Sequence, residues 1–193
     1  PYFWDIDASE KILDFAETLT IAEGEKPKPV KLKEFQYFII GSLFGWKKLN
    51  GYRRFRRSYV SMARQQGKSF INGIMGSYIA LFGNYSYGKL FTASTKRRQA
   101  RIAWEEIAKF INIDEDLQEL FEVKDYKSLI VCNVTNCTIE ALSKEGGLED
   151  GHRSIFSSLD ELHQIPTNHV YKALYNGTRA LMETLVSMIT TRG

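Results

Sequence analysis

Cysteine, histidine and long apolar runs are scarce in this sequence, and each scarcity excludes a class of protein. The two cysteines, Cys132 and Cys137, lie five residues apart with no histidine nearby, a spacing that fits neither a redox pair nor half of a zinc site. The three histidines share no metal-ligand spacing with a cysteine or a carboxylate. No apolar run approaches the roughly 18 residues of a membrane span. We therefore expect a soluble protein of a reducing compartment, with no membrane segment and no zinc site.

The chain also lacks an internal repeat, a low-complexity tract and a charged-then-apolar leader, so Pro1 is expected to mark a boundary rather than a targeting signal. Its net charge of +3 is too small to demand a nucleic-acid partner. The basic residues are unevenly spread, with concentrations at Lys26–Lys33 and Arg53–Arg57, and solvated loop charge is the ordinary interpretation of such runs. A length of 193 residues fits one compact domain with one core.

Helical and strand patterns alternate along the chain. Apolar residues at helical spacing predict helices at about 9–19, 33–46, 70–82, 100–111 and 170–181, with Asp7 or Ser9 capping the first and Gly83 ending the third. Short β-branched and apolar runs predict strands at about 55–62, 89–94, 129–134, 138–142, 155–159 and 185–190. Such alternation is typical of an α/β fold with a mainly parallel sheet covered by helices on both faces.

Two segments carry residues suited to phosphate chemistry. Gly67-Lys68-Ser69 lies between a predicted strand and a predicted helix, where backbone amides and the helix dipole converge on an anion. In such a loop the lysine neutralises the β- and γ-phosphates and the hydroxyl of Ser69 is a ligand for Mg²⁺. The full loop pattern places a glycine where this chain has Met62. Asp160-Glu161 ends a later strand and supplies one carboxylate for a hydrated Mg²⁺ and one to orient an attacking water.

From Phe35-Gln36 to Gly193 the chain resembles the large terminase subunits that package DNA into tailed-phage capsids. The resemblance rests on three motifs in order: a variant phosphate loop at 62–69, Leu159-Asp160-Glu161-Leu162-His163, and Met188-Ile189-Thr190-Thr191-Arg192-Gly193. It implies a P-loop NTPase of the additional-strand (ASCE) type that binds ATP and Mg²⁺. The residues carried over are Gln36 on the adenine, Arg64 on the γ-phosphate, Gln65, Gln66, Gly67, Lys68 and Ser69 around the phosphates, Ser69 and Asp160 on Mg²⁺, Glu161 for catalysis, and Thr190 and Thr191 as sensors of the γ-phosphate.

The same resemblance implies a motor that hydrolyses ATP to move double-stranded DNA into a procapsid. Its implied partners are a portal protein, a small terminase subunit and further copies of the chain in a homo-oligomeric ring, working in the host cell cytoplasm. Residues 1–193 would form the ATPase domain, with the helices of 1–50 on the adenine side and the nuclease domain absent from this chain. Some terminases carry a trans-acting arginine about eleven residues before the catalytic glutamate, where this chain has Asp150. Arg153 or Arg179 could take the role of that arginine here.

Two other functions use the same elements. A helicase-like nucleic-acid ATPase would share the phosphate loop and the carboxylates, and single strands would stimulate it. A nucleotide-binding assembly module would hold ATP between subunits without hydrolysing it, although Glu161 speaks against that function. The segment Tyr52–Arg57 interleaves aromatic residues with arginines as nucleic-acid surfaces do. It also leads into a predicted strand, in which alternation would send its charges to solvent.

Overall fold

The computed structural model describes residues 1–21, 26–94, 97–143, 153–160 and 169–191. The helices are α1 (Ile6–Thr18), α2 (Glu34–Gly45), α3 (Lys68–Phe82), α4 (Arg97–Ile113), α5 (Glu115–Leu120) and α6 (His169–Gly177), with a 3₁₀ turn η1 (Asp125–Lys127). The strands are β1 (Tyr2–Trp4), β2 (Thr20–Ile21), β3 (Lys28–Pro29), β4 (Trp46–Lys48), β5 (Arg57–Ser61), β6 (Lys89–Ser94), β7 (Phe121–Lys124), β8 (Leu129–Cys132), β9 (Thr138–Ser143), β10 (Phe156–Asp160) and β11 (Leu185–Thr190).

One sheet of seven strands runs through the described residues in the order β5-β11-β10-β6-β9-β8-β7. The pairs from β5 to β9 are parallel, and β8 and β7 extend the sheet antiparallel. The mainly parallel sheet is therefore confirmed. β11 lies between β5 and β10, so a further strand separates the one that leads into the phosphate loop from the one that ends in Asp160. This order is the additional-strand arrangement.

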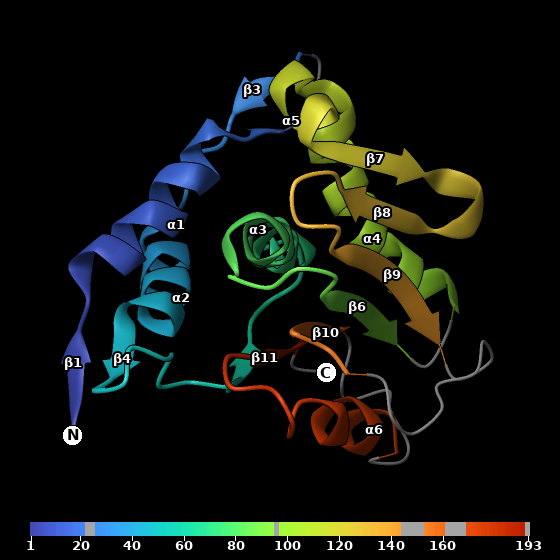
Figure 1. Cartoon of the computed structure of the whole chain (residues 1–193). Helices are drawn as coiled ribbons and strands as arrows, with labels where there is room; N and C mark the ends of the chain where they lie inside the picture. Colours follow the sequence, from blue (N-terminus) through green and yellow to red (C-terminus); the bar gives the residue numbers. More distant parts are fainter. Residues whose placement is uncertain (22–25, 95–96, 144–152, 161–168, 192–193) are drawn as a thin grey trace.

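Helices cover both faces of the sheet, as predicted (Figure 1). Alternation along β10 divides its side chains between the two layers. Phe156 joins the core beneath α3 and α4, whereas Leu159 packs with Ala173 and Leu174 of α6 on the other face. None of the helices within the described residues is long and apolar enough to cross a membrane.

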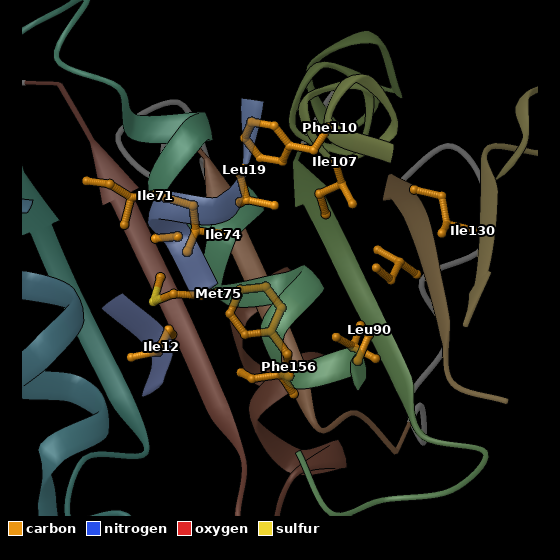
Figure 2. Close-up of a cluster of buried hydrophobic side chains, with 14 of the residues drawn as sticks. Ile12, Leu19, Ile71, Ile74, Met75, Leu90, Ile107, Phe110, Ile130 and Phe156 are labelled. Carbon is orange, nitrogen blue, oxygen red and sulfur yellow. The ribbon is translucent and has the colours of Figure 1, made fainter. Parts of the chain in front are cut away.

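The larger core brings together elements from both ends of the chain. Figure 2 shows Ile12 and Leu19 from the N-terminal segment near Ile71, Ile74 and Met75 of α3, with Leu90 and Phe156 from the sheet. Burial of each such side chain stabilises the fold by about 1.5–3 kcal/mol. Gly76 allows close approach here, because a Cβ at this position would lie 3.3 Å from both Ile107 and Phe156. α3 therefore packs against both α1 and the sheet, and Figure 1 shows it between them.

Several predicted boundaries were wrong. α1 begins at Ile6 because the carboxylate of Asp5, rather than Asp7 or Ser9, accepts a hydrogen bond from the amide of Ala8 (3.0 Å). α6 ends at Gly177 instead of residue 181. The carbonyls of the segment that follows bind the guanidinium of Arg56. The short strands β1 to β4, β7 and the helix α5 were not predicted. Gly83 does end α3, as expected.

Candidate functional site

The phosphate loop joins β5 to α3 and holds two residues in left-handed backbone conformations. Gln65 has φ 59° and Gly67, the N-cap of α3, has φ 79°. Glycine adopts this region without the steric cost of a Cβ. The Gly67 carbonyl accepts the first helical hydrogen bond, from Ile71 (2.9 Å). Because a glycine cap has no side chain, none competes with an anion for the amides of the first turn of α3.

Gln36 of α2 braces this loop. Its Nε2 donates to the carbonyl of Gln66 (3.3 Å), and its Oε1 accepts from the amide of Lys33 (2.9 Å). The ammonium of Lys33 also reaches Gln66 Oε1 (3.3 Å). Gln36 is 5% exposed, and both of its polar groups have a hydrogen-bond partner within the protein. A side-chain amide has a second N–H and a second lone pair, so the predicted adenine contact does not require either hydrogen bond to be exchanged.

A cavity of about 510 Å³ opens over the loop, a size within the usual range for small-molecule sites. It is lined by residues of the loop and the first turn of α3, by Gln36, by two lysines that precede α2, and by one side of α4. Lys31, Lys33, Lys68 and Lys109 give it four cations. Its carboxylate, Glu106, is paired with Lys109 (2.8 Å). The lining is thus positively charged overall, as a polyphosphate requires.

The tip of β10 lies at the same edge of the sheet as the loop. Asp160, the last residue of β10, is opposite Ile189 of β11, and Ile189 is opposite Val60 of β5. All three strands are parallel, so their carboxyl ends meet at one edge, where ligands bind in open α/β sheets. Asp160 is partly buried there. Glu161 lies outside the described residues.

The two predicted sensor threonines lie at the end of β11, the strand between β5 and β10. Thr190 and Thr191 are both buried, and the Thr190 hydroxyl donates to the Thr191 carbonyl (3.3 Å). The Thr190 carbonyl accepts from the amide of Met62 (3.1 Å). The end of β11 is thus hydrogen-bonded directly to the first residue of the phosphate loop. Arg64 is exposed on that loop and is not among the described residues that line the cavity.

The structure therefore gathers six predicted site residues around one cavity, namely Gln36, Gln65, Gln66, Gly67, Lys68 and Ser69. Asp160 and Thr190, with Thr191 after it, lie at the carboxyl edge of the sheet and are not among the described residues that line this cavity. Sequence reasoning missed Lys31, Lys33, Glu106, Lys109 and Phe110. The basic run 26–33 was a usable signal for the first two. For Glu106 and Lys109, the opposite charges three residues apart on a helix were the signal.

Comparison with known proteins gives a consistent result. The family model described as "Terminase large subunit, ATPase domain" matches residues 34–193. The large terminase subunit of Enterobacteria phage HK97 is 24% identical over 188 residues, which cover 95% of this chain and 36% of that protein. The chain thus spans little more than a third of the length of this curated relative.

Solved structures share the fold. The crystal structure of the HK97 large terminase matches with a TM-score of 0.81 at 22% identity, over 94% of this chain and 37% of that one. The ATPase domain of the Thermus phage P74-26 large terminase matches at 0.62 and 18%, over 84% and 66%. The UvsW helicase of bacteriophage T4 matches at 0.58 and 12%, over 93% and 59%.

Proposed function

Because this chain belongs to the family of terminase large subunits, through their ATPase domain, we propose that it hydrolyses ATP to drive double-stranded DNA into a viral procapsid. One observation carries the proposal. The phosphate loop and the acidic tip of β10 lie at one edge of the sheet, on either side of β11. The partners are those of a packaging motor in the host cytoplasm: a portal protein, a small terminase subunit and other copies of this chain in a ring.

The phosphates bind over the loop of residues 62–69. Lys68 neutralises charge on the β- and γ-phosphates, and the backbone of Gln65, Gln66 and Gly67 supplies amides to their oxygens. Arg64 reaches the γ-phosphate from the exposed side of the loop. The surplus of lysines around the cavity supports this assignment. The helices of residues 1–50 lie on the adenine side, because α2 contributes Gln36 to the cavity and braces the loop.

Ser69 and Asp160 are suited to hold a magnesium ion. Mg²⁺ prefers oxygen ligands and commonly takes one or two protein groups, with water and substrate phosphates completing its shell. A hydroxyl and a carboxylate fit that preference. When bound, the ion would neutralise the charge that develops on the phosphate oxygens.

Glu161 is the catalytic carboxylate of the proposal. Placed directly after Asp160, it accepts a hydrogen bond from the attacking water and aligns it for in-line displacement at the γ-phosphate. Thr190 and Thr191 sense the γ-phosphate. The hydrogen bond from Met62 to Thr190 supports this role, because it couples a displacement of the loop directly to the end of β11.

A helicase-like ATPase is the second candidate, and the fold likeness to UvsW is the observation that favours it. The two are separated by the nucleic acid that stimulates turnover. Duplex DNA should stimulate a packaging motor, whereas single strands should stimulate a helicase. An assembly module that holds ATP without turnover would show no hydrolysis with either.

The proposal is tested with two variants of the site. Glu161→Gln should retain ATP binding and lose hydrolysis by about 10²–10⁴-fold, the contribution of a positioned base. Lys68→Ala should weaken ATP binding itself, because a charge-assisted contact to phosphate is lost. Binding is measured by titration with a fluorescent nucleotide, and turnover by phosphate release.

Matched controls are available on the surface. Glu119→Gln and Lys127→Ala make the same changes at exposed positions, and both should leave binding and turnover as in the unaltered protein. Unchanged turnover in Glu161→Gln would reject the catalytic assignment. Unchanged affinity in Lys68→Ala would show that the loop does not hold the phosphates.

A further inference from the structure

A second charged region lies at the other end of β5, away from the nucleotide cavity. Arg54, Arg57 and Arg179 line a cleft of about 290 Å³ between the start of β5 and the end of α6, and all three are exposed. The described residues that line this cleft include no aspartate or glutamate. We name these three residues, with Tyr171 and Tyr175 of α6, the arginine patch.

Aromatic rings hold these arginines in place. The guanidinium of Arg57 lies 5.1 Å, and that of Arg179 5.9 Å, from the centre of the Tyr175 ring. Arg57 also donates to the hydroxyl of Tyr171 (3.2 Å). Cation–π contacts of this kind fix a guanidinium without neutralising its charge. The patch is therefore both positively charged and ordered before any partner arrives.

Two other arginines of the segment Tyr52–Arg57 have structural roles. Arg53 is buried against Glu183 (3.2 Å), contrary to the expectation that these charges face solvent. Arg56 donates to the carbonyls of Thr178 (2.7 Å) and Leu181 (2.9 Å). Arg56 thus ties the segment that leads into β5 to the segment that carries Arg179.

The contacts favour phosphate recognition over base recognition. Proteins that bind single strands stack bases on open aromatic faces. The Tyr175 ring is instead stacked on Tyr171, with centres 5.7 Å apart and planes 8° apart, and is flanked by two guanidiniums. Arg54 likewise lies against aromatic rings, with its guanidinium 4.3 Å from the centre of Tyr2, 4.9 Å from that of Phe55 and 5.5 Å from that of Trp46. The cleft offers arginines rather than ring faces, and phosphates are what arginines bind without regard to sequence.

We propose that the arginine patch contacts the sugar-phosphate backbone of double-stranded DNA. The inference rests on the proposed function, which supplies the duplex. Two strands of the sheet connect this contact surface to the nucleotide site. β5 runs from Arg57 to Ser61 and then into the phosphate loop, and β11, which follows the Arg179 segment, ends at Thr190. Both strands that begin beside the patch therefore end at the candidate ATP site.

The test measures duplex binding as a function of salt. The plot of log K against log salt has a negative slope, and each lost phosphate contact makes that slope less steep by about 0.9. Arg57→Ala and Arg179→Ala should each reduce the slope by about one, and the triple variant with Arg54→Ala by about three, equally for two duplexes of unrelated sequence. Binding is followed by the anisotropy of a labelled duplex between about 50 and 200 mM salt.

Lys127→Ala is the matched control, because Lys127 is also an exposed cation over a tyrosine ring, 5.4 Å from the centre of Tyr126. It should leave the slope unchanged. A slope that is unaltered in the arginine variants, an equal loss in the control, or no binding of duplex by the unaltered chain would overturn the inference. The inference also fails if the patch variants lose binding to polyglutamate but keep duplex binding, since the partner would then be an acidic protein.

ATP turnover without DNA separates this inference from the proposed function. The Arg54→Ala and Arg57→Ala variants should hydrolyse ATP like the unaltered chain, because neither residue lines the cavity. Arg179, a candidate for the arginine of other terminases, is judged by its salt slope alone. If the unaltered chain hydrolyses ATP and only the salt slopes fail, the patch assignment alone is wrong. If it does not hydrolyse ATP, the proposed function fails independently of the patch. Should the triple variant fold poorly by circular dichroism, the single variants still decide the outcome.

Discussion

Small polar side chains form one row across the sheet beneath α3. The strand register aligns Ser58 of β5, Ser187 of β11, Ser158 of β10 and Thr92 of β6. Their hydroxyls differ in what they bind. Ser187 donates to Asn72 Oδ1 of α3 (2.8 Å), whereas the Oγ of Ser158 is buried with no partner among the described residues. The row therefore contains two buried serines, of which Ser187 has a hydrogen-bond partner and Ser158 has none among the described residues.

We expect the same substitution to have different effects at these two serines. Ser187→Ala leaves the buried Oδ1 of Asn72 without a donor, which should cost about 1–3 kcal/mol of unfolding free energy. Ser158→Ala removes a hydroxyl whose burial is already unfavourable, so stability should stay unchanged or rise. Urea unfolding of both variants measures the difference. Equal destabilisation by the two substitutions would show that Ser158 also has a hydrogen-bond partner.

The row also shows where prediction from sequence stops at the residue scale. Read along the chain, Ser157 and Ser158 merely interrupt an apolar strand and weaken its pattern. In the structure both are buried, and the Ser157 hydroxyl is paired with Ser154 (2.8 Å) on the opposite face. Which hydroxyls meet depends on the register of strands that are distant in the sequence, such as Ser58 of β5 opposite Ser187 of β11. No local pattern contains that register.

At the scale of elements, the junction of β5, loop and α3 depends on one backbone conformation. Gly67 has φ 79°, and a Cβ at this position would lie 2.9 Å from Gln36 Nε2. Gly51 has nearly the same φ, 83°, but a Cβ there would meet no atom within 4 Å. Both glycines thus require a positive φ, but only Gly67 has a neighbouring side chain that an added Cβ would displace.

Alanine at either glycine should cost about 1–2 kcal/mol of unfolding free energy, the penalty of a left-handed conformation with a Cβ. Only Gly67→Ala should also weaken ATP binding, by about tenfold or more, equivalent to about 1.4 kcal/mol. The reason is that the new Cβ displaces Gln36, which holds the Gln66 carbonyl. Urea unfolding and nucleotide titration of both variants separate the two effects. Equal nucleotide affinity in the two variants would contradict the bracing role of Gln36.

The elements around the site were predictable because their signals are local. The strand before the loop, α3 and β11 each show a clear period and stand next to a turn or a motif. The elements that were missed are short and depend on pairing. β7 exists through its antiparallel ladder with β8, Phe121 opposite Cys132, around the turn η1. Its four residues follow α5 directly and include two charged side chains, whereas β8 belongs to the longer apolar run that was predicted at 129–134.

At the scale of the whole molecule, the family match begins at residue 34, yet the core does not. Ile12, Ala16, Leu19 and Val30 are all at most 2% exposed and join the same cluster as α3 and the sheet. α1 packs along α2 and touches α3, and Figure 1 shows both helices on one side of α3. We infer that the segment before residue 34 belongs to the same cooperative unit as the ATPase core.

Two isoleucines of α1 test this inference. Ile12 is fully buried and Ile6 is 57% exposed. Ile12→Ala should lower the unfolding free energy by about 2–5 kcal/mol, the cost of a buried large-to-small change, and Ile6→Ala by less than about 0.5 kcal/mol. Because α1 shares the core of the sheet, Ile12→Ala should shift a single urea transition. It should also lower the opening free energy measured by hydrogen exchange in α4 and β10 by the same amount. If α1 instead folds as a separate layer, the variant will melt α1 alone, and the protection of β10 will remain that of the unaltered chain.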